Sequence, residues 1–227
     1  MQTTTAHTPV KEIAGGHPRI WSVLERFGID YCCAGGKQPL EQACNERGVD
    51  VEAVLAAIQE VMQGPNSGPD LARLGLSELS DYIERVHHDY LKSELPSLRA
   101  RLRRVIQVHA EAHPEVVELG RIFEDFADEL ESHMAKEEHA LFPAIRQMER
   151  GEGRLPLEGP VEMMLHEHQA AGQALARMRE LTGEFTPPAD ACATFESLYR
   201  SLAELDKDMQ RHVHTENDIL FPAALKG

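Results

Sequence analysis

Two segments of the chain carry the same pattern of ionisable and apolar residues. The first runs from His133 to Ala144 and the second from His212 to Ala223, and both read H-x-x-x-E-x-x-x-L-F-P-A. Residues four apart lie on one face of an α-helix, so each copy directs an imidazole and a carboxylate to the same side. The two copies together supply two histidines and two glutamates, which are ligand types that helical bundles use to hold metal ions in their core.

The repetition decides between two interpretations of this pattern. A single H-x-x-x-E step is common on exposed helices as a weak ion pair between neighbouring turns. Duplication of a purely structural hairpin would explain the repeated apolar residues but not the repeated ionisable pair, because buried charges need partners. The two copies therefore favour metal ligation.

Further histidines precede each copy at matched distances. His88 lies 45 residues before the histidine of the first copy, and His168 lies 44 residues before that of the second. His87 and His166 would also give matched offsets, of 46 residues each, so spacing does not choose between the two sets. Either set predicts two similar helical hairpins that bring four histidines and two glutamates towards one centre.

Other histidines are expected to point away from this centre. His139 and His214 lie about 240° and about 200° around the helix from the histidine of their own copy. His109 lies 21 residues after His88, which corresponds to roughly 30 Å along a helix.

The ligand types narrow the choice of metal. Imidazole together with carboxylate suits iron, manganese or zinc, whereas calcium and magnesium prefer oxygen ligands nearly throughout. If Glu137 and Glu216 each bridge two ions, each ion receives two nitrogens and two oxygens. About two positions of an octahedron then stay open, with the ions roughly 3.5 to 4 Å apart. The natural interpretation is a di-iron centre.

Glycine and proline between Gly64 and Gly75 indicate a linker, which gives predicted domains at residues 1–64 and 77–227 joined by residues 65–76. Apolar spacing before the linker predicts three short helices. After it, four helices with short connections predict an antiparallel four-helix bundle, and the fold class is all-α. These four helices are expected at about Ser77 to His109, Pro114 to near Gly151, Pro160 to Leu181, and Ala189 to Leu220.

The composition excludes several classes of partner. A formal charge of −15 and a pI near 5.2 argue against nucleic acid and anionic membranes as main partners, because both select basic surfaces. There is no apolar run of membrane-spanning length and no signal-peptide pattern in the sequence, so we expect a cytoplasmic protein.

The four cysteines are too few and too irregularly spaced for a disulfide framework in a chain of 227 residues, so free thiols are expected. Cys32 and Cys33 are adjacent and are candidates for a functional role, with a partly buried packing pair as the alternative. Cys44 and Cys192 are expected to be core residues.

These motifs resemble the iron-sulfur cluster repair di-iron proteins, the RIC family, over nearly the whole chain. In that family a hemerythrin-like bundle follows a small domain with adjacent cysteines. The resemblance rests on Asp30-Tyr31-Cys32-Cys33 with Gly-Lys-Gln following, Glu131 through Glu138, Glu167-His168 before Ala171-Gly172, and His212 through Pro222.

The resemblance also selects among the histidines. The family's first bundle helix has its ligand histidine seven residues before a Leu-Pro pair, and Leu95-Pro96 makes that residue His88. In the third helix the Glu-His before Ala-Gly makes it His168. The resemblance therefore implies two non-haem iron ions held by terminal ligands and two bridging carboxylates. The terminal ligands would be His88, His133, His168 and His212, and the bridges Glu137 and Glu216.

The function that the resemblance implies is repair of iron–sulfur clusters damaged by nitric oxide or peroxide, by donation of iron to damaged or apo iron–sulfur proteins. Cys32 and Cys33 would receive, relay or dock the iron, although Ala34 stands where the family often has glycine. One alternative is reduction of nitric oxide to nitrous oxide at the open iron positions. Another is a sensor module that binds nitric oxide or oxygen without turnover. A homodimer through the small domain is compatible with the sequence.

Overall fold

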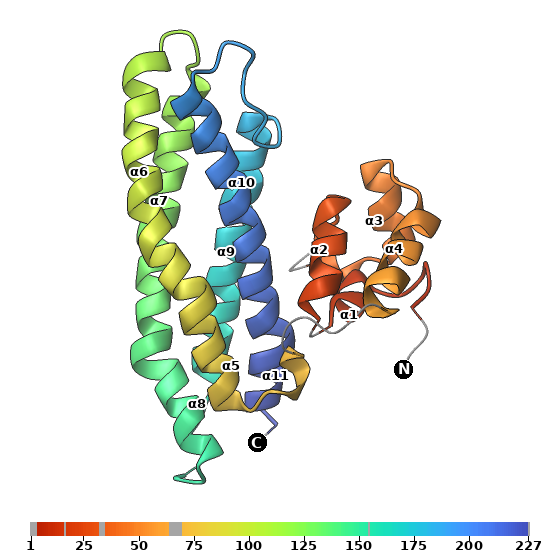
Figure 1. The fold of residues 1–227 in the computed structure, drawn as a ribbon. Helices are drawn as coiled ribbons and strands as arrows, with labels where there is room; N and C mark the ends of the chain where they lie inside the picture. The colour runs from red at the N-terminus through yellow and green to blue at the C-terminus, as the bar shows by residue number, and fades with distance from the viewer. Residues whose placement is uncertain (1–3, 16, 32–34, 64–69, 154, 227) are drawn as a thin grey trace. The chain divides into compact units, whose positions relative to one another are not determined.

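The structure, a computed structural model, describes residues 4–15, 17–31, 35–63, 70–153 and 155–226 of the chain. The regular structure of these residues is helical, and one isolated antiparallel bridge joins Pro9 to Pro39. The predicted all-α class is confirmed (Figure 1).

The chain divides into two compact units, residues 80–209 and residues 1–79 together with 210–227. The boundary after Met209 falls inside helix α10 (Ala193–His214), so this one continuous helix contributes to both units. The domain boundaries expected from the sequence, near residues 64 and 77, stay a prediction.

Residues 80–209 contain long helices that run in alternating directions (Figure 1). Helix α6 (Asp89–His109) packs against α7 (Glu115–Lys136), and α7 packs against α9 (Glu158–Thr182). With α10 they form the predicted antiparallel bundle. Apolar residues at three- and four-residue spacing place one stripe of α6 in the core, as the helical period requires; these residues are Leu91, Leu95, Leu98, Leu102 and Val105.

Widened, π-helical segments interrupt the long helices at the histidine and glutamate motifs. They span Glu84–His88 after α5 (Leu76–Ile83), Glu137–Leu141 after α7, and Thr215–Leu220 after α10. Each begins or ends at, or contains, a residue of the predicted centre. Such segments are rare in helices and concentrate at functional sites, because the extra residue re-aims the side chains around it.

The repeated Phe-Pro pair explains two of these segments. Short helices α8 (Phe142–Glu149) and α11 (Phe221–Ala224) start at these pairs, with Pro143 and Pro222 in their first turn. A proline has no N–H to donate to the carbonyl four residues earlier, so the preceding turn lacks one α-helical bond and can widen. The same sequence repeat therefore encodes both the predicted ligand pair and the local backbone that presents it.

The N-terminal part contains one more helix than the sequence indicated. Helix α2 (Pro18–Arg26) packs against α1 (Val10–Ala14) and α4 (Val51–Gln63), and α3 (Leu40–Arg47) packs against α4. Single turns of 3-10 helix lie at residues 35–37 and 71–73. Helix α1 has five residues, too few for a helical period to be visible in the sequence.

Within the same unit, the end of α10 contacts the N-terminal helices. The Arg211 guanidinium pairs with Glu25, with an Nε–Oε1 distance of 2.7 Å. The buried His214 donates from Nε2 to the Gly15 carbonyl at 2.7 Å, and its ring meets those of Trp21 and Tyr31 edge-on. Arg211 and His214 thus contact the N-terminal helices through polar and aromatic interactions within this unit.

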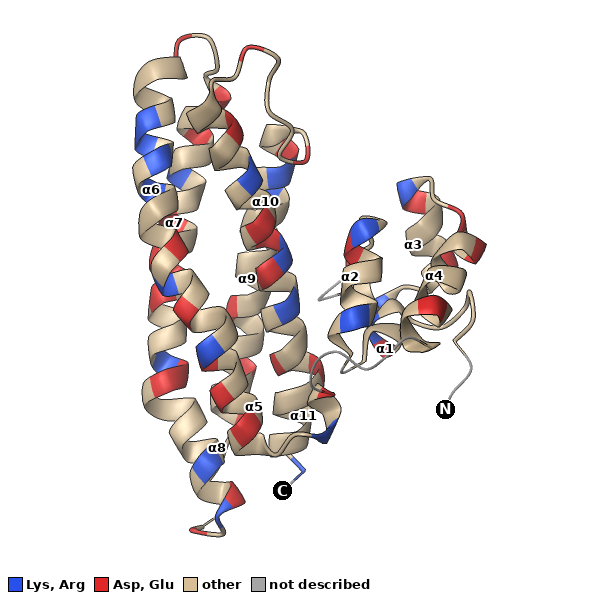
Figure 2. Ribbon diagram, viewed as in Figure 1, with Lys and Arg blue, Asp and Glu red and all other residues tan. Residues whose placement is uncertain are grey.

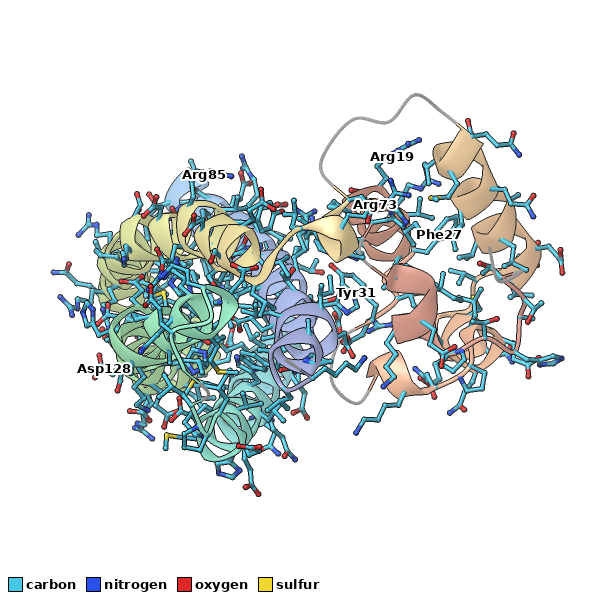
Figure 3. The ribbon with its side chains drawn as sticks, turned by 90° about the horizontal axis from the view of Figure 1, so that it is seen from below. Arg19, Phe27, Tyr31, Arg73, Arg85 and Asp128 are labelled. Carbon is cyan, nitrogen blue, oxygen red and sulfur yellow. The ribbon has the colours of Figure 1, made fainter. Side chains whose placement is uncertain are left out.

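The surface of the bundle carries both signs of charge, interspersed along each helix (Figure 2). Arg99 of α6, for example, pairs with Glu124, Asp128 and Glu131 of α7. Seen along the bundle, Arg85 and Asp128 lie on its outside (Figure 3). Among the described residues, no helix combines the length and the apolar character that crossing a membrane requires.

Candidate metal centre

Glu137 lies between two histidines that come from different helices. Its Oε2 is 3.3 Å from Nε2 of His88, and its Oε1 is 3.3 Å from Nε2 of His133. Glu137 and His88 have no exposed surface and His133 is 4% exposed. One oxygen thus faces each imidazole, which is the arrangement of a carboxylate that bridges two ions with a histidine on each.

The hydrogen-bond state of Glu137 tests whether a cation fits there. Within the described part of the chain, neither carboxylate oxygen of Glu137 accepts a hydrogen bond. Burial of an ionised carboxylate without donors costs several kcal/mol, and this cost is offset when the group coordinates a metal. The residues present therefore fit a cationic occupant.

Two further histidine nitrogens face each other beside Glu137. Nε2 of His168, on α9, lies 3.0 Å from Nε2 of His133. Neighbouring ligands of an octahedral ion are separated by about 3 Å when metal–nitrogen bonds are about 2.1 Å long. The pair is therefore already spaced as two ligands of the same ion.

The second H-x-x-x-E copy contributes His212 and Glu216, which are fully buried and whose Nε2 and Oε1 atoms lie 3.0 Å apart. Two groups of ligand atoms are present, the atoms within each group lie within 4.8 Å of one another, and both groups contain Glu137 and Glu216. The first group adds His88 and His212, and the second adds His133 and His168. The six residues predicted from the sequence are thus brought together, while their ligation of a metal stays a prediction.

Carboxylates behind the histidines fix the orientation of the rings. Nδ1 of His88 contacts Glu138 Oε1 at 2.8 Å, and Nδ1 of His133 contacts Glu167 Oε2 at 2.8 Å. A carboxylate can only accept, so each ring carries its proton on Nδ1 and directs the Nε2 lone pair towards the centre. This is the tautomer that metal ligation requires.

A lysine neutralises each of these supporting carboxylates. Lys92 lies 2.6 Å from Glu138, and Lys136 hydrogen-bonds Glu167. Partial burial opposes ionisation of both glutamates, but the hydrogen bonds from the lysine and the histidine outweigh it and hold each pKa below its usual range. Both carboxylates are therefore ionised near neutral pH, as their orienting role needs.

The supporting role of Glu138 and Glu167 was not predicted from the sequence. The available signal was adjacency, since Glu138 follows Glu137 and Glu167 precedes His168. Which histidine each glutamate supports depends on the packing of neighbouring helices, and this is not contained in a spacing rule.

The histidines outside the two ligand groups contact other residues or are exposed. Nδ1 of His87 contacts Oδ1 of Asp208 at 2.9 Å, and its ring meets Tyr82 edge-on. His166 and His139 are exposed. The structure therefore brings His88 rather than His87, and His168 rather than His166, to the centre.

A cavity of about 450 Å³ opens beside His133 and His168, and it is lined by residues of α7, α9 and α10. Apolar surface dominates its wall, and Glu167 and Lys136 line it together with the two histidines. A small molecule or an ion can therefore approach this side of the centre.

The structure describes two of the four cysteines, and these two differ in burial. Cys32, Cys33 and the neighbouring Ala34 lie outside the described residues. Cys44 is buried, which confirms its predicted place in the core. Cys192 is exposed, so its predicted core position is wrong. The reason is that it lies in the connection before α10, where the chain has not yet entered the packed helix.

A four-helix bundle with overlapping clusters of histidine and glutamate at widened helical turns defines a metal-binding bundle protein. Residues 79–224 match the model of the Hemerythrin HHE cation binding domain. Residues 6–62 match a Domain of Unknown function (DUF542). The chain belongs to the hemerythrin HHE cation-binding family.

Curated relatives match the chain over nearly its full length. The chain is 37% identical over 216 residues to the "Iron-sulfur cluster repair protein YtfE" of Musicola paradisiaca, with 95% of each chain covered. It is 36% identical over 219 residues to proteins of the same name from Enterobacter sp. (strain 638) and Escherichia coli O17:K52:H18, with 96% of this chain and 97% of each relative covered. These matches confirm the family resemblance inferred from the motifs.

Proposed function

We propose that this protein is a non-haem di-iron protein that repairs iron–sulfur clusters damaged by nitrosative or oxidative stress, and that it does so by donating iron. The observation that carries the proposal is the buried Glu137 carboxylate, which accepts no hydrogen bond within the described residues and faces an imidazole with each oxygen. The names of the relatives, iron-sulfur cluster repair proteins, support the same assignment.

The two groups of ligand atoms suggest how the six residues divide. His88 and His212 would bind one iron, and His133 and His168 the other, with Glu137 and Glu216 shared as bridges. Bound there, iron is a redox-active and exchangeable ion that can serve as cargo. Four protein atoms per ion leave about two coordination positions for exchange.

The cavity beside His133 and His168 supports release on that side. The ion pair of Lys136 and Glu167 lies at the cavity wall, and the same Glu167 holds the His133 ring. Movement of Glu167 would therefore loosen a terminal ligand at the place where an ion can leave.

The cysteine pair is the proposed docking or relay group for the released iron. Tyr31, which immediately precedes Cys32, is buried, and its hydroxyl donates to Glu25 at 2.9 Å. Its ring meets that of His214, two residues beyond His212, with centroids 5.5 Å apart. Tyr31 thus contacts the end of α10, which carries the proposed ligand His212.

Transfer of labelled iron tests the proposal. The full-length protein, loaded anaerobically with iron-57, is mixed with an apo [4Fe–4S] enzyme and a sulfide source, and Mössbauer spectroscopy follows the label. We expect the label to appear in the rebuilt cluster while the activity of the enzyme returns. An equal amount of free ferrous iron, with a ferrous chelator in both samples, is the control for simple leakage.

The same assay assigns the cysteines. The Cys32→Ala/Cys33→Ala protein should retain its iron spectrum and lose repair, because its bundle is unchanged and its docking group is gone. Full repair by this double variant would remove the cysteines from the mechanism. Label that remains in the bundle of the unaltered protein would instead reject iron donation.

Reduction of nitric oxide is a second candidate, favoured by the apolar cavity that reaches the centre. The ferrous ions would supply the two electrons that convert two nitric oxide molecules and two protons to nitrous oxide and water. Many equivalents of nitrous oxide per protein with added reductant, and no loss of iron, would support this activity over donation.

A further inference from the structure

A second cluster of metal-binding side chains lies at the opposite end of α6 from His88. His109 is the last residue of α6, and His113 lies in the connection to α7. Asp190 and Cys192 lie in the connection between α9 and α10. The two connections lie at the same end of the bundle (Figure 1), so two separate parts of the chain contribute to this loop cluster.

The side chains already form two ligand-like pairs. Nε2 of His109 lies 3.3 Å from Sγ of Cys192. Nε2 of His113 lies 3.1 Å from Oδ1 and 3.2 Å from Oδ2 of Asp190. In both histidines Nε2 therefore faces the connection that carries Cys192 and Asp190.

Two neighbours hold the histidines in these positions. Glu115 Oε1 lies 3.2 Å from Nδ1 of His113, so the ring has a carboxylate on its far side, as histidine ligands of metals do. The buried Phe195 ring contacts both imidazoles, with centroid distances of 5.2 Å to His109 and 5.4 Å to His113. Phe195 of α10 thus packs against both imidazole rings.

We propose that His109, His113, Asp190 and Cys192 form a second metal site, selective for a zinc-class ion. Two nitrogens, one sulfur and one oxygen are a tetrahedral zinc set. Ligand atoms of a tetrahedral zinc ion are separated by about 3.3 to 3.6 Å, and the separations within both pairs are close to this range. The thiolate favours a softer ion than the histidine and glutamate centre does.

Closure onto one ion requires the two pairs to approach each other, because among the described residues no three of these ligand atoms lie within 4.8 Å of one another. The two imidazole centroids are 6.3 Å apart, whereas two histidines on a tetrahedral ion place them about 5 Å apart. The two rings therefore have to approach by about 1 Å, and His113, Asp190 and Cys192 lie in the connections between helices. Asp190 is 70% exposed and Cys192 is exposed, so an ion can enter from solvent. The bound ion would clamp the α6–α7 connection to the α9–α10 connection.

Cobalt binding to the full-length, iron-loaded protein tests this site. Substitution of Cys32→Ala and Cys33→Ala in every sample removes the other candidate thiols, and Cys44 is buried. We expect about one cobalt ion per chain beyond the iron, with sulfur-to-cobalt charge-transfer absorption in the near ultraviolet and displacement by zinc. Iron content is measured in parallel, so that exchange at the other centre is detected.

Two variants test whether the cobalt ion binds to the proposed residues. Cys192→Ala should abolish the charge-transfer band, and His113→Gln should weaken cobalt binding at least tenfold, while the exposed His139→Gln serves as the matched control. A band that persists in Cys192→Ala, or an iron-loaded protein that binds no cobalt, would overturn the site. Circular dichroism checks folding. Because iron transfer is assayed separately, failure of this site leaves the proposed repair function untouched.

Discussion

The bundle carries two histidine clusters that differ in how they are stabilised without a metal. Around Glu137 the ligand atoms come from helices and are buried, and this carboxylate accepts no hydrogen bond within the described residues. In the loop cluster His109 ends a helix, the other three side chains come from connections, and Asp190 is largely solvated. Desolvation therefore favours a cation more strongly at the first cluster than at the second. We expect this difference in burial to give tighter metal binding around Glu137 than at the loop cluster.

The largest loss of bound iron is expected from Glu137→Gln. Both groups of ligand atoms contain Glu137, so loss of its charge should remove both ions rather than one. Iron per chain, measured by mass spectrometry of anaerobically loaded protein, should fall at least tenfold. Cobalt binding at the loop cluster should not change.

Glu162→Gln, at an exposed position of α9, is the matched control for this substitution and should load normally. Normal iron content in Glu137→Gln would show that the carboxylate is not a shared ligand.

The adjacent residues His87 and His88 allow two different roles to be tested within one π-helical segment. His88→Gln should lose at least half of the bound iron, because His88 belongs to one of the two ligand groups. His87→Gln should keep its iron and lose about 1 to 3 kcal/mol of unfolding free energy, because the buried contact with Asp208 is broken. Iron analysis and urea denaturation of both variants separate the two roles. Equal iron loss in the two variants would contradict the assignment.

Substitution of a supporting carboxylate should lower the affinity for iron by an intermediate amount. Glu167→Gln leaves an amide in place of the ionised acceptor that holds Nδ1 of His133, and loss of such partners lowers metal affinity about 10- to 100-fold. Competition with a calibrated ferrous chelator measures the change, again against Glu162→Gln. Unchanged affinity would mean that His133 is oriented by packing alone.

The buried centre was largely predictable from the sequence because its ligands lie on helices. A repeated four-residue step fixes His133 with Glu137, and His212 with Glu216, on common helical faces whatever the tertiary packing. The choice of His88 over His87 was not accessible in this way, since adjacent residues differ by only about 100° around a helix and a π-helical segment ends there. Resemblance to the family supplied that choice.

The loop cluster could not be predicted, for a physical reason. His109 and Cys192 are 83 positions apart in the chain, and no periodicity relates residues in two separate connections. The expected core position of Cys192 was wrong because apolar character alone does not show where α10 begins. The supporting glutamates Glu138 and Glu167 were missed for a related reason, since their partners lie on other helices.

In the metal-free protein, substitution of Glu137 should have a smaller effect, on stability, and one of opposite sign. Removal of the metal leaves the Glu137 carboxylate buried among histidines, a position in which a neutral amide avoids the desolvation cost of a charge. Metal-free Glu137→Gln should therefore be more stable than the metal-free parent by about 1 to 3 kcal/mol, although it cannot hold iron. Metal-free Cys192→Ala should match its parent, because solvent already reaches that thiol. Urea denaturation in the presence of a chelator measures both. A destabilised Glu137→Gln would mean that the carboxylate supports the fold by itself, and burial would then not distinguish the two clusters.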